Sequence, residues 1–245
     1  MTMPDLRTFE IAGTVLDGAS FGDYLKPGRL IDSDHPAIAA FAAEAVGAAT
    51  DPVDKAVRLY HAVRDGVRYD PYGTPMRRDA YVASNCLAAG HGYCINKAGL
   101  MAAAARAQRI PARVGYADVR NHMSTRRLTG WIGTDVFYFH GYAELWLEDR
   151  WTKATPAFNR ELTDKFRLRP LDWDGRTDSI YHPFDLEGRR HMEYLAYRGV
   201  YADLPFDLIR DAFKVLYPRM YDAGGNATLG RGDFAAEGAA EAARG

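Results

Sequence analysis

The sequence predicts an α+β protein in which a helix that begins with a cysteine packs against an antiparallel sheet. Three observations support this fold class. The alanine-rich segment from Cys94 to Gln108 has the composition of a strong helix, because alanine is the best helix former. Apolar runs at 112–119, 135–148 and 151–158 are typical of strands. The turn residues 148–150 join the last two runs as a predicted hairpin, and helical patterns precede all of them.

The N-terminal third of the chain contains two predicted helices. The first covers about residues 36–46. The second begins at Asp51-Pro52, where the aspartate caps the helix and the proline takes its first position. Turn residues at 69–73 end this second unit. Residues 74–93 then read as an irregular loop that leads to the cysteine.

The C-terminal part shows weaker patterns. Residues 160–205 are mixed, with short helical pieces and aromatic loops, and residues 205–217 predict a terminal helix. From residue 223 the chain consists mainly of Gly, Ala, Arg and Glu, which predicts a disordered tail over 223–245. We therefore expect a single domain over residues 1–222, with a core at about 50–160, a C-terminal extension at 161–222 and then the tail.

Composition narrows the classes of function. The chain has 245 residues, a net charge of -1 and 47% hydrophobic residues, so a basic nucleic-acid-binding face is not expected. We expect no membrane span and a cytoplasmic location, since no apolar stretch reaches the roughly 20 residues needed and no signal pattern opens the chain. The two cysteines, Cys86 and Cys94, do not form a disulfide scaffold, and we expect them to be reduced.

The tripeptide Gly92-Tyr93-Cys94 places a thiol in the first turn of the predicted helix. Free N–H groups and partial positive charge at a helix N-terminus favour a thiolate over a thiol, so we expect the pKa of Cys94 to be lowered. A single histidine, His140, lies inside the strand predicted over 135–148. A thiol followed by such a histidine is typical of nucleophilic catalysis, in which the imidazole takes the proton of the thiol.

Residues 92–100 and 104–116, read as GYCINKAGL and AARAQRIPARVGY, resemble the transglutaminase-like superfamily. In that family a small-residue turn precedes a cysteine that begins a helix, and the helix ends in a Gly-Ile-Pro-Ala-Arg-like turn before a strand. Here Arg109 stands where the glycine often is. Residues 140–146 (HGYAELW) resemble the His-Ala-Trp-x-Glu-Val strand of the family.

Two further segments extend the resemblance over about residues 50–160. Residues 150–156 (RWTKATP) are similar to the strand that carries the third member of the catalytic triad, and residues 63–70 (VRDGVRYD) are similar to the helix end before the catalytic region. The resemblance implies a papain-like fold and a Cys94–His140 pair that attacks an amide, ester or thioester through a thioester intermediate. Cys86 stands outside this pair and is expected to be structural.

In bacteria, proteins of this kind look more often like proteases, amidases or acyl transferases than like calcium-dependent cross-linkers. The resemblance therefore implies a cysteine hydrolase or acyl transferase, with a peptide-like or small amide or thioester substrate. No loop of the calcium-binding type appears, and no cofactor is expected. Substrate and oligomeric state are left open.

The third triad position departs from the family pattern. The residue expected to be aspartate is Thr155, and a threonine can orient an imidazole but cannot offset the charge of an imidazolium. Thr155 is the first candidate by position. Asn159, just past the strand, is a second candidate, as in papain-like enzymes. Asp185, which would come from elsewhere in the fold, is a third. The sequence does not choose among them.

Other interpretations compete with a hydrolase. A carrier-bound thioester would make the protein a biosynthetic acyl transferase or cyclase, and loss of the triad aspartate would suit an inactive binding protein of the same fold. Cys86, His91, Cys94 and His140 are of the types that bind zinc, although their spacing is not a usual ligand pattern. Aromatic residues gather between Tyr181 and Tyr221, where they either form the core of the C-terminal extension or line a substrate cleft.

Overall fold

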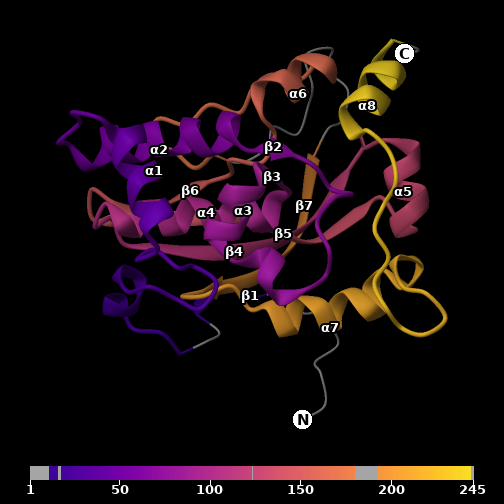
Figure 1. The fold of residues 1–245 in the computed structure, drawn as a ribbon, viewed down its shortest axis with the longest axis horizontal. Helices are drawn as coiled ribbons and strands as arrows, with labels where there is room; N and C mark the ends of the chain where they lie inside the picture. The colour runs from indigo at the N-terminus through magenta and orange to yellow at the C-terminus, as the bar shows by residue number, and fades with distance from the viewer. Residues whose placement is uncertain (1–10, 16–17, 123, 180–191, 244–245) are drawn as a thin grey trace.

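A computed structural model describes residues 11–15, 18–122, 124–179 and 192–243. The described helices are α1 (Pro36–Val46), α2 (Pro52–Gly66), α3 (Ala83–Ala89), α4 (Cys94–Ala107), α5 (Arg126–Ile132), α6 (Arg160–Lys165), α7 (Phe206–Leu216) and α8 (Phe234–Ala242). The described strands are β1 (Ile11–Val15), β2 (Arg68–Tyr69), β3 (His91–Gly92), β4 (Ala112–Asn121), β5 (Val136–Leu147), β6 (Arg150–Ala154) and β7 (Met192–Tyr201). Figure 1 shows the arrangement of these elements.

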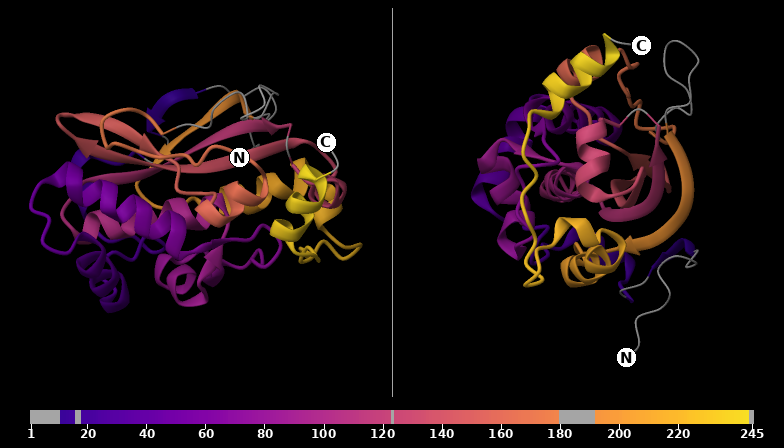
Figure 2. Two further views of the ribbon diagram at one scale, coloured as in Figure 1. Left: turned by 90° about the horizontal axis from the view of Figure 1, so that it is seen from above. Right: turned by 90° about the vertical axis from the view of Figure 1, so that its right-hand side faces the viewer.

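The main sheet has the strand order β1-β7-β4-β5-β6. Strands β4, β5, β6 and β7 pair antiparallel with their neighbours, whereas β1 pairs parallel with β7. Helices α1 to α4 lie on one face of this sheet, as the view from above in Figure 2 shows. The predicted α+β class, with the cysteine helix on an antiparallel sheet, is confirmed.

Helix α4 is the centre of the molecule. Its residues from Cys94 to Arg106 are all buried, between helices α1, α2 and α3 and strands β4 and β5. The run of alanines fits this position, because small side chains let elements approach from every side. Two charged side chains in the helix bind backbone carbonyls. Lys97 Nζ donates to Arg64 O at 2.8 Å and to Val67 O at 2.5 Å, and Arg106 donates to three further carbonyls.

Local sequence signals account for several element boundaries. The Asp51 carboxylate accepts a hydrogen bond from Asp54 N at 2.9 Å, as expected of the cap of α2. The hairpin predicted at 148–150 is confirmed, because Leu147 pairs with Arg150 and the two residues between them have positive φ, as in a tight two-residue turn. The cap of α1 is His35, whose Nδ1 accepts from Ala37 N at 3.2 Å.

Two interpretations of loops were wrong. Residues 74–93 are not irregular throughout, because they contain a short 3-10 helix at Arg78–Tyr81, helix α3 and strand β3. Helix α3 ends at Gly90, whose φ of 67° is left-handed. The mixed region 160–205 includes strand β7, which pairs with β4 in the interior of the sheet. Its partners come from distant parts of the sequence, so local pattern alone did not reveal it.

The region expected to be a disordered tail contains helix α8. The Asp233 carboxylate caps it by accepting from Ala236 N at 3.0 Å. Phe234 is buried against the rings of Tyr69 and Phe166, at centroid distances of 5.6 and 5.1 Å. Glu237 adds polar contacts, because its carboxylate accepts from Tyr72 Oη at 2.7 Å and from Thr125 Oγ1 at 3.0 Å. The division into a core at 50–160 and an extension at 161–222 stays a prediction.

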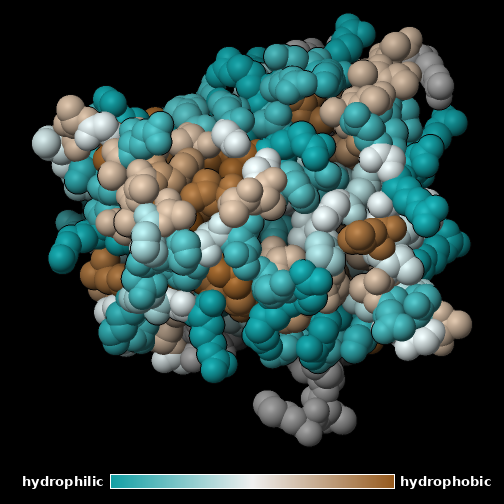
Figure 3. All heavy atoms as spheres, in the orientation of Figure 1, coloured by the Kyte–Doolittle hydropathy of each residue, from teal (hydrophilic) through white to brown (hydrophobic). Residues whose placement is uncertain are grey.

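The surface over the helical layer mixes hydrophilic and hydrophobic residues, as Figure 3 shows for this face. Within the described ranges, none of the helices has the length and apolar character to cross a membrane.

Candidate active site

Cys94 is the first residue of α4, and the turn before it is tightly packed. A Cβ on Gly92 would lie 2.9 Å from Asn96 Cβ and 3.1 Å from Cys86 Sγ, so a larger residue would push the start of the helix away. Asn96 holds the same turn, because its Oδ1 accepts from Tyr93 N at 3.3 Å and its Nδ2 donates to Ala80 O at 2.8 Å. The predicted position of the thiol at a helix N-terminus is confirmed.

His140 lies on β5, directly before Gly141, and Gly141 faces the start of α4. A Cβ on Gly141 would come within 2.9 Å of Ile95 Cα and 3.1 Å of Cys94 O. The strand therefore approaches the helix backbone as closely as a glycine allows. This close approach brings the two elements that carry Cys94 and His140 together. Both side chains line one cleft.

A bulge in β5 sets the position of His140. Ala117 pairs with His140 but Val119 pairs with Phe137, so β5 has an extra residue opposite Asp118. Phe139, at the bulge, has a φ of 55°, and its N–H donates to the Asp118 carboxylate at 3.2 Å. That carboxylate also forms a buried ion pair with Arg198. The strained backbone next to His140 is thus held by an ion pair between β4 and β7.

A residue from the C-terminal part also supports the bulge. Tyr217 Oη accepts from Tyr138 N at 2.5 Å and donates to Val136 O at 3.3 Å. The sequence analysis left open whether the C-terminal aromatic residues form core or line a cleft. Phe213 and Tyr217 line the cleft, whereas Tyr194 and Tyr197 stack on each other at 6.4 Å. Tyr181 lies outside the described residues.

Aromatic side chains outnumber aliphatic ones in the lining of the cleft beside Cys94 and His140. We call it the aromatic cleft and define it by its eight rings, those of Tyr69, Tyr81, Tyr93, Trp131, Phe137, Tyr138, Phe213 and Tyr217. The rings come from β2, the 3-10 helix at Arg78–Tyr81, the start of α4, α5, β5 and α7 with the residue after it. Thr228 also lines it, and Trp131 Nε1 donates to Thr228 Oγ1 at 3.4 Å. The cleft is thus assembled from segments far apart in the sequence.

Burial sets the protonation state of the candidate pair. It raises the pKa of the Cys94 thiol to about 11, although the backbone N–H groups of Gly141, Ile95 and Cys94 itself favour the thiolate. It also lowers the pKa of His140 to about 4. The expectation of a lowered thiol pKa was therefore wrong, because loss of water around the sulfur outweighs the helix N-terminus. At neutral pH the pair consists of a thiol and a neutral imidazole.

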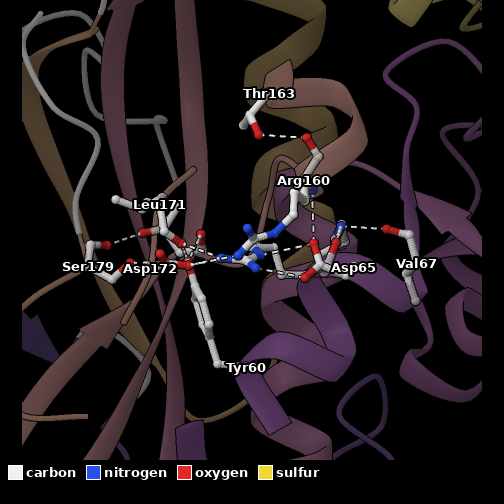
Figure 4. Close-up of polar contacts among 11 residues, drawn as sticks. Tyr60, Asp65, Val67, Arg160, Thr163, Leu171, Asp172 and Ser179 are labelled. Carbon is white, nitrogen blue, oxygen red and sulfur yellow. Dashed lines mark hydrogen bonds and ion pairs between the residues drawn. The ribbon is translucent and has the colours of Figure 1, made fainter. Parts of the chain in front are cut away.

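Thr155, the first candidate for the third position, is bound to other groups. Its Oγ1 donates to Ser179 O at 2.7 Å, and its carbonyl accepts from Tyr60 Oη at 3.2 Å. Figure 4 shows Tyr60 pointing toward Leu171 and Ser179, and Tyr60 Oη also donates to Leu171 O at 2.5 Å. No hydrogen bond between these described residues joins Thr155 to His140. The hydroxyl ties the end of β6 to the segment at 171–179.

The other two candidates differ in what the structure says of them. Asn159 Oδ1 accepts from Tyr69 N at 3.1 Å, so the amide fixes the backbone of a residue in the aromatic cleft. It makes no hydrogen bond to His140, which is likewise a described residue. Asp185 lies outside the described residues. The identity of the third residue stays a prediction.

Cys86 lies close to the turn that precedes Cys94 and was one of the four residues of the zinc interpretation. Cys86 is buried, and burial raises the pKa of its thiol to about 12. Within the described part of the chain, no three His, Cys, Asp or Glu side chains are grouped as a metal site would require. Cys86 Sγ instead contacts His91 O at 3.8 Å, which places it in the packing behind the turn at Gly92.

Sequence reasoning missed two features of the site. The close approach at Gly141 could have been predicted from the sequence, because a glycine inside a strand often marks a place where another backbone comes close. The buried Asp118–Arg198 pair carries none, since the two residues are 80 positions apart in the chain.

Comparison with known proteins agrees with this architecture. Residues 39–156 match the model of the transglutaminase-like superfamily. A search of curated proteins finds no match.

Two solved structures are similar at low identity. One, from Cytophaga hutchinsonii, is described as a "putative cysteine protease"; it is 17% identical with a TM-score of 0.45, and the match covers 78% of this chain and 58% of that one. The other, from Parabacteroides distasonis, is described as a "putative protease"; it is 15% identical with a TM-score of 0.36, and the match covers 55% of this chain and 25% of that one. The chain thus spans little more than half of the first protein and a quarter of the second.

Proposed function

We propose that the protein is a cysteine-dependent hydrolase or acyl transferase that acts on an amide, ester or thioester through a covalent thioester on Cys94. The observation that carries the proposal is the shared cleft, in which a thiol at a helix start and an imidazole on the adjacent strand face the same space. The match of residues 39–156 to the model of the transglutaminase-like superfamily supports it.

The neutral state of the pair determines how the reaction would begin. His140 Nε2 or Nδ1 takes the proton of the thiol while the sulfur attacks the acyl carbon, so charge separates only as the S–C bond forms. Backbone N–H groups around the sulfur are suited to hold the oxyanion. The imidazolium then gives its proton to the leaving group as the C–N, C–O or C–S bond breaks. Water or an amine next attacks the thioester and restores the thiol.

The proposal is tested by trapping the acyl-enzyme. The protein is mixed with acyl thioesters, and the mass of the intact chain is followed with time. We expect an increase equal to one acyl group in wild type and in Cys86→Ser, and none in Cys94→Ala. His140→Gln should slow acylation by about 100-fold or more, in the range that general base catalysis contributes. Acylation of Cys86, or equal rates with and without His140, would contradict the proposal.

A second candidate is a binding protein that uses the same cleft without chemistry. It is favoured by the raised pKa of Cys94 and by the engagement of Thr155 with Ser179. The same experiment separates the two, because a binding protein forms no adduct with any acyl donor.

A further inference from the structure

Two of the tyrosines that line the aromatic cleft, Tyr93 and Tyr217, have hydroxyl groups bonded within the protein. Tyr93 Oη is hydrogen-bonded to Tyr81 Oη at 2.7 Å. Tyr217 Oη is occupied by two backbone groups of β5, those of Tyr138 and Val136. Trp131, Phe137 and Phe213 supply hydrocarbon surface. The Tyr93 and Tyr217 hydroxyls are thus engaged within the protein, and the faces and edges of these rings remain for binding.

The same cleft lacks formal charge among its described lining residues. None of these is Asp, Glu, Lys or Arg. His140 is the one histidine, and burial lowers its pKa to about 4, so the imidazole is neutral at pH 7. An acidic or basic group placed here would lose its hydration and gain no counter-ion. A neutral group would lose little on leaving water.

Aromatic walls also distinguish between neutral groups. Rings bind other rings in edge-to-face or offset geometry, and this adds to the gain from burying apolar area. The walls already use such geometry among themselves, since Phe213 and Tyr217 meet at 4.8 Å with an interplanar angle of 73°. An aromatic acyl group fits this surface better than an aliphatic chain of equal length.

We propose that the aromatic cleft binds the acyl part of the substrate and selects a neutral aromatic acyl group of the arylalkanoyl class. The inference rests on the proposed function, because it takes Cys94 as the acceptor of that group. In the covalent step the bond from sulfur to the acyl carbon forms and the bond to the leaving group breaks. The thiol proton passes through His140 to the leaving group.

The selectivity is tested with thioesters that share one leaving group, N-acetylcysteamine. The acyl groups are 3-phenylpropanoyl, hexanoyl, succinyl and 6-aminohexanoyl. The first has an aromatic ring, the second is a neutral aliphatic chain, and the last two carry a negative and a positive charge. The rate of acyl-enzyme formation is measured by intact mass. We expect 3-phenylpropanoyl to react at least 10-fold faster than hexanoyl and at least 100-fold faster than either charged donor. Equal rates, or a charged donor reacting fastest, would overturn the inference.

A binding measurement on a variant that cannot be acylated tests the cleft assignment independently of the proposed catalytic function. Cys94→Ala is titrated with 3-phenylpropanamide and with hexanamide by isothermal calorimetry. We expect the aromatic amide to bind at least 10-fold more tightly. If no donor acylates wild type but the aromatic amide is preferred, the proposed function fails and the cleft assignment stands. If Cys94→Ala shows no preference, the cleft assignment fails whatever the chemistry.

A pair of tryptophan variants locates the preference. Trp131→Ala removes one wall of the cleft and should cut the preference for the aromatic acyl group at least fivefold. Trp146→Ala is the matched control, because Trp146 is also half-buried but packs against Phe21 and Trp151. If the alanine variant does not fold, Trp131→Leu keeps more of the apolar volume without an aromatic ring, and should show the same loss. An unchanged preference in both Trp131 variants would contradict the assignment.

Discussion

The protonation state of Cys94 has a measurable consequence for its reactivity. The thiol is 7% exposed, and burial raises its pKa from an ordinary 9.0 to about 11. Because the two pKa values differ by about two units, the thiolate fraction of Cys94 at pH 8 is about 100-fold lower in the folded protein than in the unfolded chain. Since the thiolate is the nucleophile, alkylation in the folded state should be slower by at least the same factor.

The assay is alkylation by iodoacetamide, followed by intact mass between pH 6 and pH 10. The Cys86→Ser variant leaves Cys94 as the one thiol, and the same variant in denaturant is the reference. We expect the rate in the folded protein to rise about tenfold per pH unit with no plateau below pH 10. The limited exposure of the sulfur lowers all rates together and leaves this slope unchanged.

The His140→Gln variant distinguishes a buried, neutral thiol at Cys94 from a thiolate–imidazolium ion pair. Because His140 is neutral in the free protein, the variant should show the same pH slope as its parent. A plateau below pH 8 that disappears in His140→Gln would refute the reasoning, because it would mean that a thiolate–imidazolium pair forms despite burial. The raised pKa of Cys94 also makes the stability of the protein depend on pH. Because the folded state favours the protonated thiol, the free energy of unfolding should fall as pH rises from about 9 to 11.

Two further predictions concern His140 and Thr155. The pKa of His140 falls from 6.5 to about 4 on folding, so between these values the unfolded chain binds a proton that the folded chain does not. Stability should therefore fall by up to about 3 kcal/mol as pH drops from 7 to 4, and His140→Gln should lose correspondingly less in urea titrations; an identical loss would contradict the cause given. Thr155→Val removes the bond to Ser179 O and should cost about 1–2 kcal/mol of stability while changing acylation less than tenfold. A rate loss as large as that of His140→Gln would instead show that Thr155 orients the imidazole.

Local sequence alone determined the start of the site. Glycine before Cys94 and the alanines after it are short-range signals, and they correctly placed a thiol at a helix N-terminus. The alternation and turn residues from 135 to 154 likewise gave the hairpin that carries His140. These features depend on neighbours in the chain, so propensity and pattern were sufficient to predict them.

The environment of the site was decided by contacts between distant segments. The helix N-terminus favours a thiolate, yet the surrounding layers exclude water from the sulfur, and only the folded molecule shows that burial dominates. Thr155 was the first of three candidates to orient His140, by its position along the strand, but its hydroxyl donates to Ser179 O, in a segment that sequence order does not place nearby. Short-range sequence signals thus predicted that a thiol begins a helix and that an imidazole lies on the adjoining hairpin. The tertiary structure decided their charge, their partners and the aromatic walls around them, because desolvation and long-range packing do not exist until the chain has folded.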